Sequence, residues 1–359
     1  MHHKESNMTI KRINFCQKLF NEFSDIIDVR SPLEYEEDHV PRAINLPVLT
    51  NRERAIVGKV YKQENKFEAK KLGAALISKN ISKHINQNLI KKGKEWKPII
   101  YCWRGGQRSY ALATILSQIG WDVTIMEGGY KSFRKSISKF IDEEIVNFKI
   151  VLITGNTGTG KTKMLKALKK NGVQIVDLEK LANHKGSVFG SQGQRQPSQK
   201  RFETELFKEF NEKNQSHYIV LEAESSKIGN ISIPKGLWNV MKTAPQIELA
   251  ASIDYRSSFL ITQYSEIIKN KSLLKKQISS LLELSGSRQV NEWLKLADEK
   301  KFSLLAASLM ESHYDPRYKK SRLRNKRKII STIDLDDISL EKIRAGAEHI
   351  KSILSNYPD

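Results

Sequence analysis

Cysteine is scarce in this sequence, which has only Cys16 and Cys102 among its 359 residues. Two thiols exclude a disulfide framework and favour a reducing compartment. Long apolar runs are also missing, because no stretch approaches the roughly 20 residues that cross a bilayer. No secretory signal pattern precedes the first predicted strand. We therefore expect a cytoplasmic protein without a membrane partner.

Acidic residues are outnumbered, with 40 Asp and Glu against 61 Lys and Arg, for a net charge of +21. Such an excess favours a polyanionic partner, and nucleic acid is the usual one inside cells. The densest basic run spans 319–328, and it is either a solvated loop or a contact for phosphate backbones. The candidate nucleic-acid contacts within it are Arg322, Arg324, Lys326, Arg327 and Lys328.

Length and periodicity predict two α/β domains. The first covers residues 10–140, with a lysine-rich helical insertion at about 51–95. The second covers 145–359, and its residues 256–310 read as a helical lid over a parallel sheet. Cys16 lies beside Phe15 in a segment of amphipathic spacing, so we expect it in the core. The oligomeric state is not fixed by the sequence.

One cysteine stands where chemistry is expected. An apolar strand at 99–101 leads into Cys102 and a Gly-rich turn, and a periodic helix follows. Backbone N–H groups of such a turn bind an anion and lower the pKa of a thiol. We predict Cys102 as a nucleophile, while a buried structural cysteine is the plainer alternative. The residues expected to bind an oxyanion here are Arg104, Gly105, Gly106 and Arg108.

The second domain opens with a complete phosphate-binding motif. A strand at 148–153 runs into G-x4-G-K-T, and a helix follows, which is the context that this motif requires. Lysine in the motif contacts terminal phosphates, and the threonine hydroxyl can bind Mg²⁺. The motif residues are Gly155, Gly158, Gly160, Lys161 and Thr162.

Further strands are predicted at 173–177, 218–222, 246–250 and 329–335. Two of them end in the carboxylates Asp177 and Glu222, and the loop after the first contains His184. These three are candidates for the second site, although a histidine in a loop is more often a turn residue. Glutamate stands where nucleotide hydrolases carry aspartate, which makes nucleotide hydrolysis less expected.

Three segments of the first domain resemble the rhodanese family in their order: "DVRSPLEYEEDHVPRAINLP", "YCWRGG" and "MEGGYKSFR". The resemblance implies that Asp28 and Arg30 support the cysteine loop. The C-x5-R-S spacing also matches tyrosine-phosphatase-like enzymes, whose loop fits a phosphate-sized group. A rhodanese or phosphatase-like cysteine enzyme, or a sulfur carrier that binds tRNA, therefore remains an alternative.

Over essentially the whole chain, the motifs resemble the tRNA 2-selenouridine synthase family: "YCWRGGQRS", "GNTGTGKT", "DLEKLANHKGSVFG", "QPSQKRFE", "LEAESSKIGN" and "HYDPRYKKS". The resemblance implies a transferase that geranylates wobble 2-thiouridine of tRNA from geranyl diphosphate. It then replaces the geranylated sulfur with selenium from selenophosphate.

On this hypothesis the phosphate loop binds geranyl diphosphate, with a nucleotide as the competing ligand, and the Cys102 loop binds selenophosphate. Cys102 attacks selenium to form a selenosulfide, or it helps to expel the geranyl thiol in another way. No tightly bound cofactor is expected beyond a possible Mg²⁺ at Thr162, and a selenophosphate-supplying protein is a possible partner.

Overall fold

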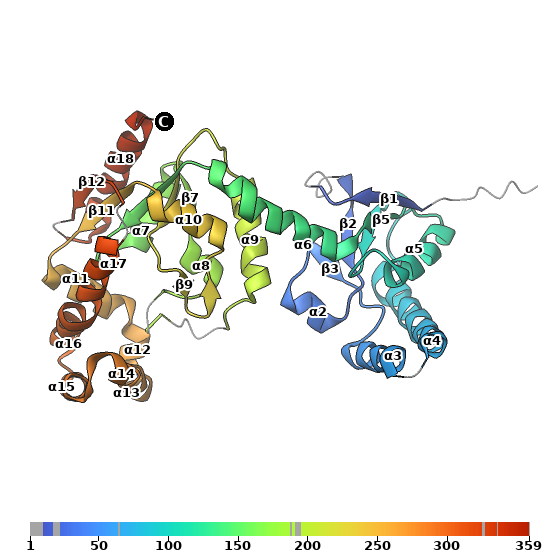
Figure 1. Ribbon diagram of the computed structural model, residues 1–359, viewed down its shortest axis with the longest axis horizontal. Coiled ribbons are helices and arrows are strands. Elements are labelled where there is room, and N and C mark those ends of the chain that lie inside the picture. Colours follow the sequence, from blue (N-terminus) through green and yellow to red (C-terminus); the bar gives the residue numbers. More distant parts are fainter. Residues whose placement is uncertain are drawn as a thin grey trace, which may run out of the picture. The chain divides into compact units, whose positions relative to one another are not determined.

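The computed structural model describes residues 10–16, 22–63, 65–186, 189–190, 195–324, 327–335 and 337–358, with backbone only at 321–324. The chain forms two compact units. The first consists of Met1–Phe140 and Pro197–Lys208, and the second of Ile141–Gln196 and Glu209–Asp359. Both are α/β structures with a parallel sheet, as the sequence predicted (Figure 1).

The first unit is built on a five-stranded sheet of order β1-β5-β4-β2-β3, in which every pairing is parallel. Helices connect the strands, as parallel pairing requires. In chain order its elements are β1 (Lys11–Asn14), β2 (Asp25–Asp28), α2 (Pro32–Glu37), β3 (Ala43–Asn45), α3 (Asn51–Gln63), α4 (Lys66–His84), the π-helical turn η1 (Ile85–Leu89), β4 (Pro98–Tyr101), α5 (Gln107–Ile119), β5 (Thr124–Glu127) and α6 (Gly129–Lys139).

The predicted insertion consists of α3, α4 and η1, so its helical character is confirmed. Ile81 of α4 and Leu89 of η1 are buried in the core that also holds Leu112 of α5. Because the sheet residues of this core include Ile27 and Ile100, the insertion covers part of one sheet face. It therefore replaces solvent over the strands that carry the cysteine loop.

One expectation for side-chain burial, that of Cys16, was wrong. Cys16 is exposed, because β1 is extended and period-2 alternation puts Cys16 opposite the half-buried Ile13 and Phe15. Ile119 is also 52% exposed at the end of α5. The buried stripe of α5 instead runs through Ser109, Leu112 and Leu116, which turns Ser109 toward the cysteine loop.

Segment Pro197–Lys208, expected in the second domain, belongs to the first unit. It holds most of α9 (Gln199–Asn211). Thr204 donates a hydrogen bond of 2.9 Å to the buried carboxylate of Asp38, and Arg134 of α6 lies 3.6 Å from the same carboxylate. These polar contacts to a buried charge explain why the segment joins this unit.

The second unit has a five-stranded parallel sheet of order β12-β11-β6-β8-β7 and a separate hairpin of β9 and β10. The strands predicted from sequence are all present, within two residues at their ends. In addition to α9, its elements as far as β11 are η2 (Phe140–Glu144), η3 (Ile145–Asn147), β6 (Ile150–Thr154), α7 (Lys161–Lys170), β7 (Gln174–Val176), α8 (Leu178–Ala182), β8 (Ile219–Glu222), β9 (Lys227–Ile228), β10 (Ile231–Ser232), α10 (Lys235–Thr243) and β11 (Gln246–Ala250).

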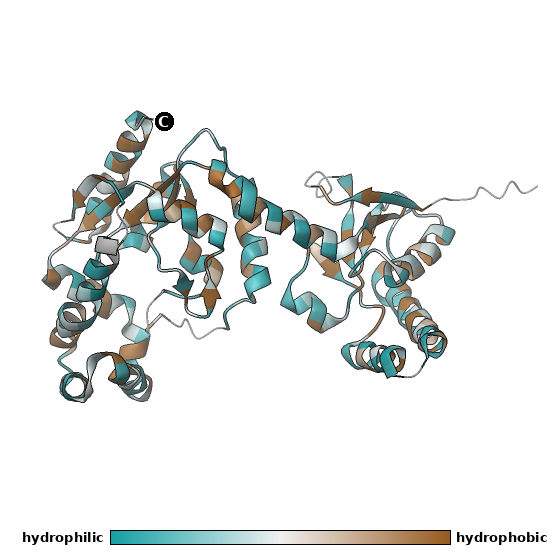
Figure 2. Cartoon of the chain, viewed as in Figure 1, coloured by the Kyte–Doolittle hydropathy of each residue, from teal (hydrophilic) through white to brown (hydrophobic). Residues whose placement is uncertain are grey.

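The remaining elements follow β11. They are α11 (Ile253–Gln263), α12 (Ser265–Lys269), α13 (Lys271–Ser279), α14 (Leu282–Ser285), α15 (Ser287–Asp298), α16 (Phe302–Leu309), η4 (Met310–Tyr314), α17 (Asp315–Arg324), β12 (Ile329–Asp334) and α18 (Leu340–Asn356). Helices α7 and α18 pack together on one core with the sheet, through Met164, Leu168 and Ile350. Hydrophobic colours concentrate on the strands, and hydrophilic ones on outward helix faces (Figure 2).

The helical lid predicted at 256–310 is longer in the structure, where helices continue from Ile253 to Arg324. It has its own core, centred on Trp293, Ile278 and Leu281, and Phe189 packs into it. A separate core means that this region is a helical subdomain and not a single flap. Among the described helices, none combines the length and apolar character of a membrane span.

Candidate functional sites

The structure places Cys102 directly after β4. The residue is 4% exposed, and hydrogen-bond donors surround its sulfur. The backbone N–H of Gly106 donates to Sγ at 3.2 Å, and the Ser109 hydroxyl lies 3.4 Å from it. Burial works to raise the pKa of this thiol. The hydrogen bonds from Ser109 and from the backbone of Arg104, together with the charge of Arg108, outweigh burial and lower the pKa.

A second turn supports the cysteine loop from the segment "MEGGYKSFR". The backbone N–H groups of Tyr130 and Lys131 donate to the carbonyls of Cys102 and Trp103, each at 2.9 Å. Gly129 has φ +55°, and a Cβ there would stand 2.3 Å from the Cys102 carbonyl oxygen. Only glycine fits so close an approach of two backbones, which explains this part of the motif.

Asp28 and Arg30 form a buried ion pair below the loop, with 0% and 1% exposure. The Arg30 guanidinium donates to both Asp28 carboxylate oxygens, at 2.6 Å for the shorter contact from Nη2, and also to the Asp38 carbonyl. The Tyr101 hydroxyl donates to Asp28 at 2.7 Å. The pair thus connects the strand that delivers Cys102 to the segment after α2, and its charges are satisfied by several partners.

The two arginines of the cysteine loop have different surroundings. Arg108 donates to Glu34 at 2.8 Å and 3.3 Å and is 15% exposed. Burial would raise the pKa of Glu34, but Arg108 and Ser31 lower it to about 2. Arg104 is exposed at the mouth of the loop, beside Gly105 and Gly106. An incoming anion therefore meets Arg104 and the N–H groups first, and Arg108 only in exchange with Glu34.

In the second unit the phosphate loop joins β6 to α7, with glycines in conformations that side chains disfavour. Gly155 has φ +150°, and a Cβ there would stand 2.6 Å from the Leu249 carbonyl oxygen. Lys161 Nζ donates back to the Gly155 carbonyl at 3.0 Å. Gly158 and Gly160 also have positive φ, so the loop has the turn geometry of a phosphate cradle.

Three glutamates crowd the end of the sheet beside Lys161. Carboxylate oxygens of Glu179, Glu222 and Glu224 lie within 4.8 Å of one another. The Thr162 hydroxyl donates to Glu222 at 2.9 Å. Burial raises the pKa of all three glutamates, mutual repulsion adds to it, and Lys161 only partly opposes the rise.

This cluster fits a divalent cation. Hard cations such as Mg²⁺ bind carboxylate and hydroxyl oxygens, and Thr162 supplies the hydroxyl. Within the described part of the chain, no donor reaches the buried Glu222 Oε2. A buried carboxylate oxygen without a donor is costly unless a cation neutralises it.

The other second-site candidates have structural contacts. Asp177 caps α8, its Oδ1 accepting from the Lys180 N–H at 2.8 Å. His184 Nδ1 accepts from the Gly186 N–H at 3.1 Å, and burial lowers the pKa of His184. A Cβ on Gly186 would stand 2.9 Å from Glu224, so the loop at 183–186 does border the glutamate cluster.

An arginine that the sequence analysis did not single out ties the helical subdomain to the phosphate loop. Arg256 of α11 is 6% exposed and donates to the Thr157 carbonyl at 3.2 Å. It also pairs with Asp315 at 3.0 Å and 2.9 Å. Tyr318 of α17 lies with its ring centroid 5.4 Å from Lys161 Nζ. The motif "HYDPRYKKS" could have indicated these contacts from sequence, because it contains both Asp315 and Tyr318.

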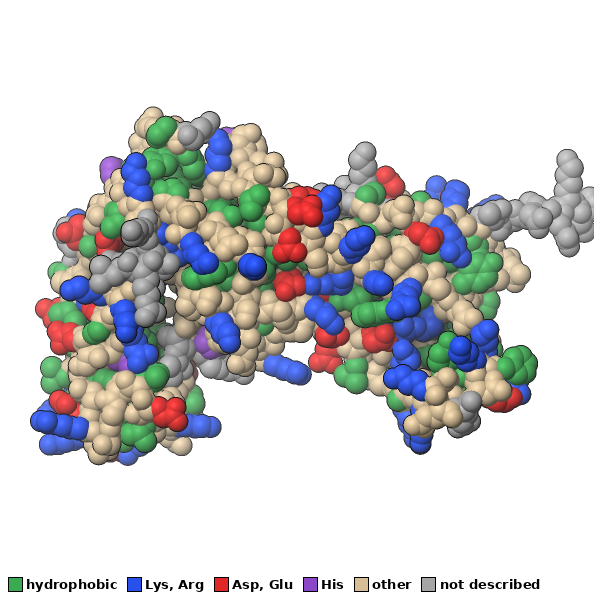
Figure 3. Space-filling view, viewed as in Figure 1, with side chains coloured by type: hydrophobic (Ala, Val, Ile, Leu, Met, Phe, Trp, Pro, Cys, Tyr) green, Lys and Arg blue, Asp and Glu red, His purple; other side chains and the backbone are tan. Residues whose placement is uncertain are grey.

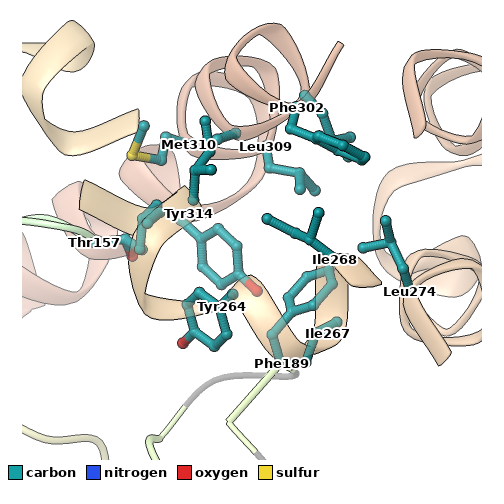
Figure 4. Close-up of a pocket in the computed structure, with 14 residues that line it drawn as sticks. Thr157, Phe189, Tyr264, Ile267, Ile268, Leu274, Phe302, Leu309, Met310 and Tyr314 are labelled. Carbon is teal, nitrogen blue, oxygen red and sulfur yellow. The ribbon is translucent and has the colours of Figure 1, made fainter. Parts of the chain in front are cut away.

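An apolar pocket opens beside the phosphate loop, within the helical subdomain (Figure 4). Its cavity volume is about 80 Å³, and it is open to solvent on one side. Thr157 of the loop stands at one end, while Phe302 and Leu274 lie toward the other. The lining consists of Thr157, Phe189, Leu260, Ile261, Tyr264, Ile267, Ile268, Leu274, Phe302, Leu305, Ala306, Leu309, Met310 and Tyr314.

The candidate nucleic-acid run is only partly described. Arg322 and Arg324 lie in α17, where the backbone alone is described, and Lys326 lies outside the described residues. Lys328 is exposed, whereas Arg327 is half-buried, and burial lowers its pKa. Of the described pair, Lys328 is therefore the better placed to contact a phosphate.

A cysteine loop on one parallel sheet and a phosphate loop on another define a rhodanese domain joined to a P-loop domain. A model of the rhodanese-like domain matches residues 14–136, and a model described as the tRNA 2-selenouridine synthase AAA domain matches residues 148–280. Both matches agree with the folds described above.

Relatives identify the family. The chain is 34% identical to the tRNA 2-selenouridine synthase of Shewanella denitrificans over 280 residues, covering 77% of this chain and 74% of the relative. It is 31% identical to that of Proteus mirabilis over 360 residues, covering 92% and 97%. The synthase of Psychromonas ingrahamii is 34% identical over 261 residues, covering 71% and 69%. This chain belongs to the tRNA 2-selenouridine synthase family.

Replacement of Ser109 by alanine removes the hydroxyl that lowers the pKa of Cys102. In a Cys16→Ser background, we expect Ser109→Ala to slow alkylation of Cys102 by iodoacetamide at pH 7 by roughly three- to tenfold. The rate–pH profile should move to higher pH. Ser117→Ala, on the same helix, is the control and should leave the profile in place; an unchanged profile in Ser109→Ala would contradict the assignment.

The glutamate cluster predicts a pH dependence of stability. Because the pKa of Glu222 rises from the ordinary 4.5 to about 8 on folding, the folded state holds its proton where the unfolded state has lost it. Stability should therefore fall as pH rises through this window, and Mg²⁺ should restore about 2 kcal/mol at pH 8.

The measurement is thermal unfolding across pH 5–8 with and without Mg²⁺. Glu224→Gln keeps the side-chain volume and should flatten both the pH dependence and the Mg²⁺ effect. The exposed Glu292→Gln is the control. A wild-type stability that is flat across the window and indifferent to Mg²⁺ would refute the cation site.

Proposed function

We propose that the protein converts wobble 2-thiouridine of tRNA into 2-selenouridine in two steps, as a transferase. Its relatives are named for the formation of 2-selenouridine in tRNA. In the first step the second unit transfers a geranyl group from geranyl diphosphate to the thiouridine sulfur. In the second step the first unit replaces that alkylated sulfur with selenium from selenophosphate, delivered free or by a supplying protein.

The observation that carries the first step is the apolar pocket beside the phosphate loop. An allylic diphosphate has an anionic head and a hydrocarbon tail, and the loop and pocket match these two parts in adjacent positions. A nucleotide fits less well, because a base requires polar partners and this lining is almost wholly apolar. Glu222 in place of the usual aspartate also fits a site that needs no positioned water.

Geranyl transfer requires stabilisation of a leaving anion more than activation of a nucleophile. The sulfur of thiouridine forms the new bond to the first carbon of the chain, and the carbon–oxygen bond to diphosphate breaks. Lys161 and the loop N–H groups face the charge that develops on the departing diphosphate. Tyr318 stacks against Lys161 and orients its amine.

Mg²⁺ would be held by Glu179, Glu222 and Glu224, with Thr162 beside them. When bound, it supplies positive charge that neutralises diphosphate oxygens. The three close carboxylates favour binding of a cation here. The Lys161 amine neutralises part of the negative charge of the diphosphate. Arg256 joins the helical subdomain to the loop, so it fixes the position of the pocket walls relative to the phosphate site.

The second step uses the better leaving group that alkylation creates. A thiocarbonyl sulfur leaves poorly, whereas a geranyl thiol can be displaced from C2 of the base. The Cys102 loop would bind the phosphate of selenophosphate through its N–H groups and Arg104. Cys102, with its lowered pKa, would attack C2 of the base as a thiolate and expel geranyl thiol. The selenium of selenophosphate would then displace the Cys102 sulfur from C2, and hydrolysis of the selenium–phosphorus bond would release phosphate.

The test is nucleoside mass spectrometry of thiouridine-containing tRNA incubated with geranyl diphosphate, selenophosphate and Mg²⁺. Wild type should give selenouridine. Cys102→Ala should accumulate geranylated thiouridine, and Lys161→Ala should leave the substrate unchanged, with losses of at least about 100-fold. If wild type leaves the nucleoside unchanged, the two-step proposal fails, and phosphatase and sulfur-carrier assays decide between its alternatives.

The pocket also predicts selection by chain length. Phe302 lies toward the end of the pocket away from Thr157, so Phe302→Ala should lengthen the space available to the tail (Figure 4). We expect the ratio of farnesyl to geranyl transfer to rise by about tenfold or more, because each buried methylene contributes to discrimination.

Ile278→Ala is the matched control for chain length. Ile278 belongs to the same helical core and is fully buried, but it does not line the pocket. Ile278→Ala should lower the free energy of unfolding without changing the ratio of farnesyl to geranyl transfer. An unchanged ratio in Phe302→Ala would place the hydrocarbon tail elsewhere.

A further inference from the structure

A wide hollow lies in the first unit, between α3 and α4 of the insertion and α5 of the cysteine loop. Its cavity volume is about 600 Å³, and it is open to solvent on one side. Facing positions are small, with Gly58 on α3, Gly73 and Ala74 on α4 and Ala111 on α5. The helices therefore meet over the sheet without filling the space between them.

The walls of this hollow carry charge of one sign. Arg54, Lys62, Lys70 and Arg108 line it, and no Asp or Glu is among the described residues that do. Lys and Arg side chains also gather over this part of the unit in Figure 3. Arg108 and Arg54 are paired with Glu34, at 2.8 Å and 4.0 Å, so Lys62 and Lys70 are the cations of the lining with no acidic partner among the described contacts. Two such lysines favour a ligand that carries phosphate groups.

The floor of the hollow is apolar, formed by Val57, Ile77 and Ile115, and Tyr61 stands at its side with 51% exposure. Free phosphate or a plain polyanion makes no use of such a floor. An exposed tyrosine beside lysines is instead a stacking surface for an unpaired base. The ligand should therefore combine phosphates, a base and a hydrocarbon group.

The hollow adjoins the cysteine loop. Gln107 and Arg108 line it, and they begin α5 directly after the turn whose Gly106 N–H donates to Cys102 Sγ. A ligand lying in the hollow therefore has one end beside the residues that hold the thiol. This position distinguishes the hollow from a surface that only attracts RNA.

We propose that this hollow binds the S-geranylated anticodon loop, the intermediate of the two-step reaction, and so rests on the function proposed above. The hydrocarbon chain lies on Val57, Ile77 and Ile115, the flanking phosphates contact Lys62 and Lys70, and a base stacks on Tyr61. The helical insertion is thereby the element that distinguishes alkylated from unalkylated RNA before selenium transfer.

The test measures binding of anticodon stem-loop RNAs that differ only at one nucleotide, 2-thiouridine or its S-geranyl form, by fluorescence anisotropy at fixed salt. Wild type should prefer the geranylated RNA by about tenfold or more. Ala74→Phe fills the hollow from an exposed position and should abolish the preference. Ala75→Phe, exposed on the same helix but outside the hollow, is the matched control.

A second pair of measurements separates this proposal from the first. Ala74→Phe should still geranylate thiouridine RNA at the wild-type rate, because that step uses the second unit. Lys62→Ala with Lys70→Ala should weaken binding of both RNAs alike and reduce its salt dependence. Failure of geranylation in wild type would refute the proposed function, whereas the binding preference is measured without that reaction.

Three results would overturn the hollow as the binding site. Equal affinity of wild type for the two RNAs would remove the need for an apolar floor. Ala74→Phe retaining the full preference would place recognition elsewhere, for example in the apolar pocket of the second unit. Displacement of the geranylated RNA by free geranyl diphosphate in wild type, but not in Ala74→Phe, would assign the hollow to the donor.

Discussion

Both sites depend on one constraint, which is that a parallel strand ends with backbone N–H groups that must be satisfied. After β4 these groups surround the Cys102 sulfur, and after β6 they form the phosphate loop. Each turn is compressed against a second backbone, the first against Gly129 and the second against the Leu249 carbonyl. Each site therefore requires glycine at the point of close backbone approach, Gly129 in the first unit and Gly155 in the second.

The electrostatics of the two sites differ although both face anions. In the first unit, Arg108 is already paired with Glu34, and the negative charge of that carboxylate is thereby neutralised. In the second, three glutamates crowd one lysine, and burial and mutual repulsion raise their pKa, so a cation that enters takes the place of their protons. The first site suits a ligand that brings its own charge to N–H groups, and the second suits a ligand that arrives with a metal ion.

Sequence reasoning found both loops because they are local, with Cys102 and Lys161 surrounded by residues adjacent in the chain. It also placed β4 of the first sheet and all five strands of the second, since buried parallel strands are short apolar runs. It predicted no strand at β1 or β5. It did not find Glu179 or Arg256, whose partners lie far away in sequence. It also missed the exposure of Cys16, which was expected in the core from amphipathic spacing but lies just beyond the edge strand β1. Pairing between distant segments, such as Asp38 with Thr204, leaves no periodic signal.

The proposed two-step chemistry would give a physical reason for an apolar group on an anionic RNA. Burial of a methylene is worth about 0.8 kcal/mol, so a ten-carbon chain offers up to ~8 kcal/mol of differential binding. Even a third of that separates alkylated from unalkylated tRNA by roughly 100-fold. Phosphate contacts cannot provide this selection, because they are identical in substrate and intermediate. A surface that joins lysines to an apolar floor beside Cys102 can impose the order of the steps, because only RNA that carries the leaving group is held there.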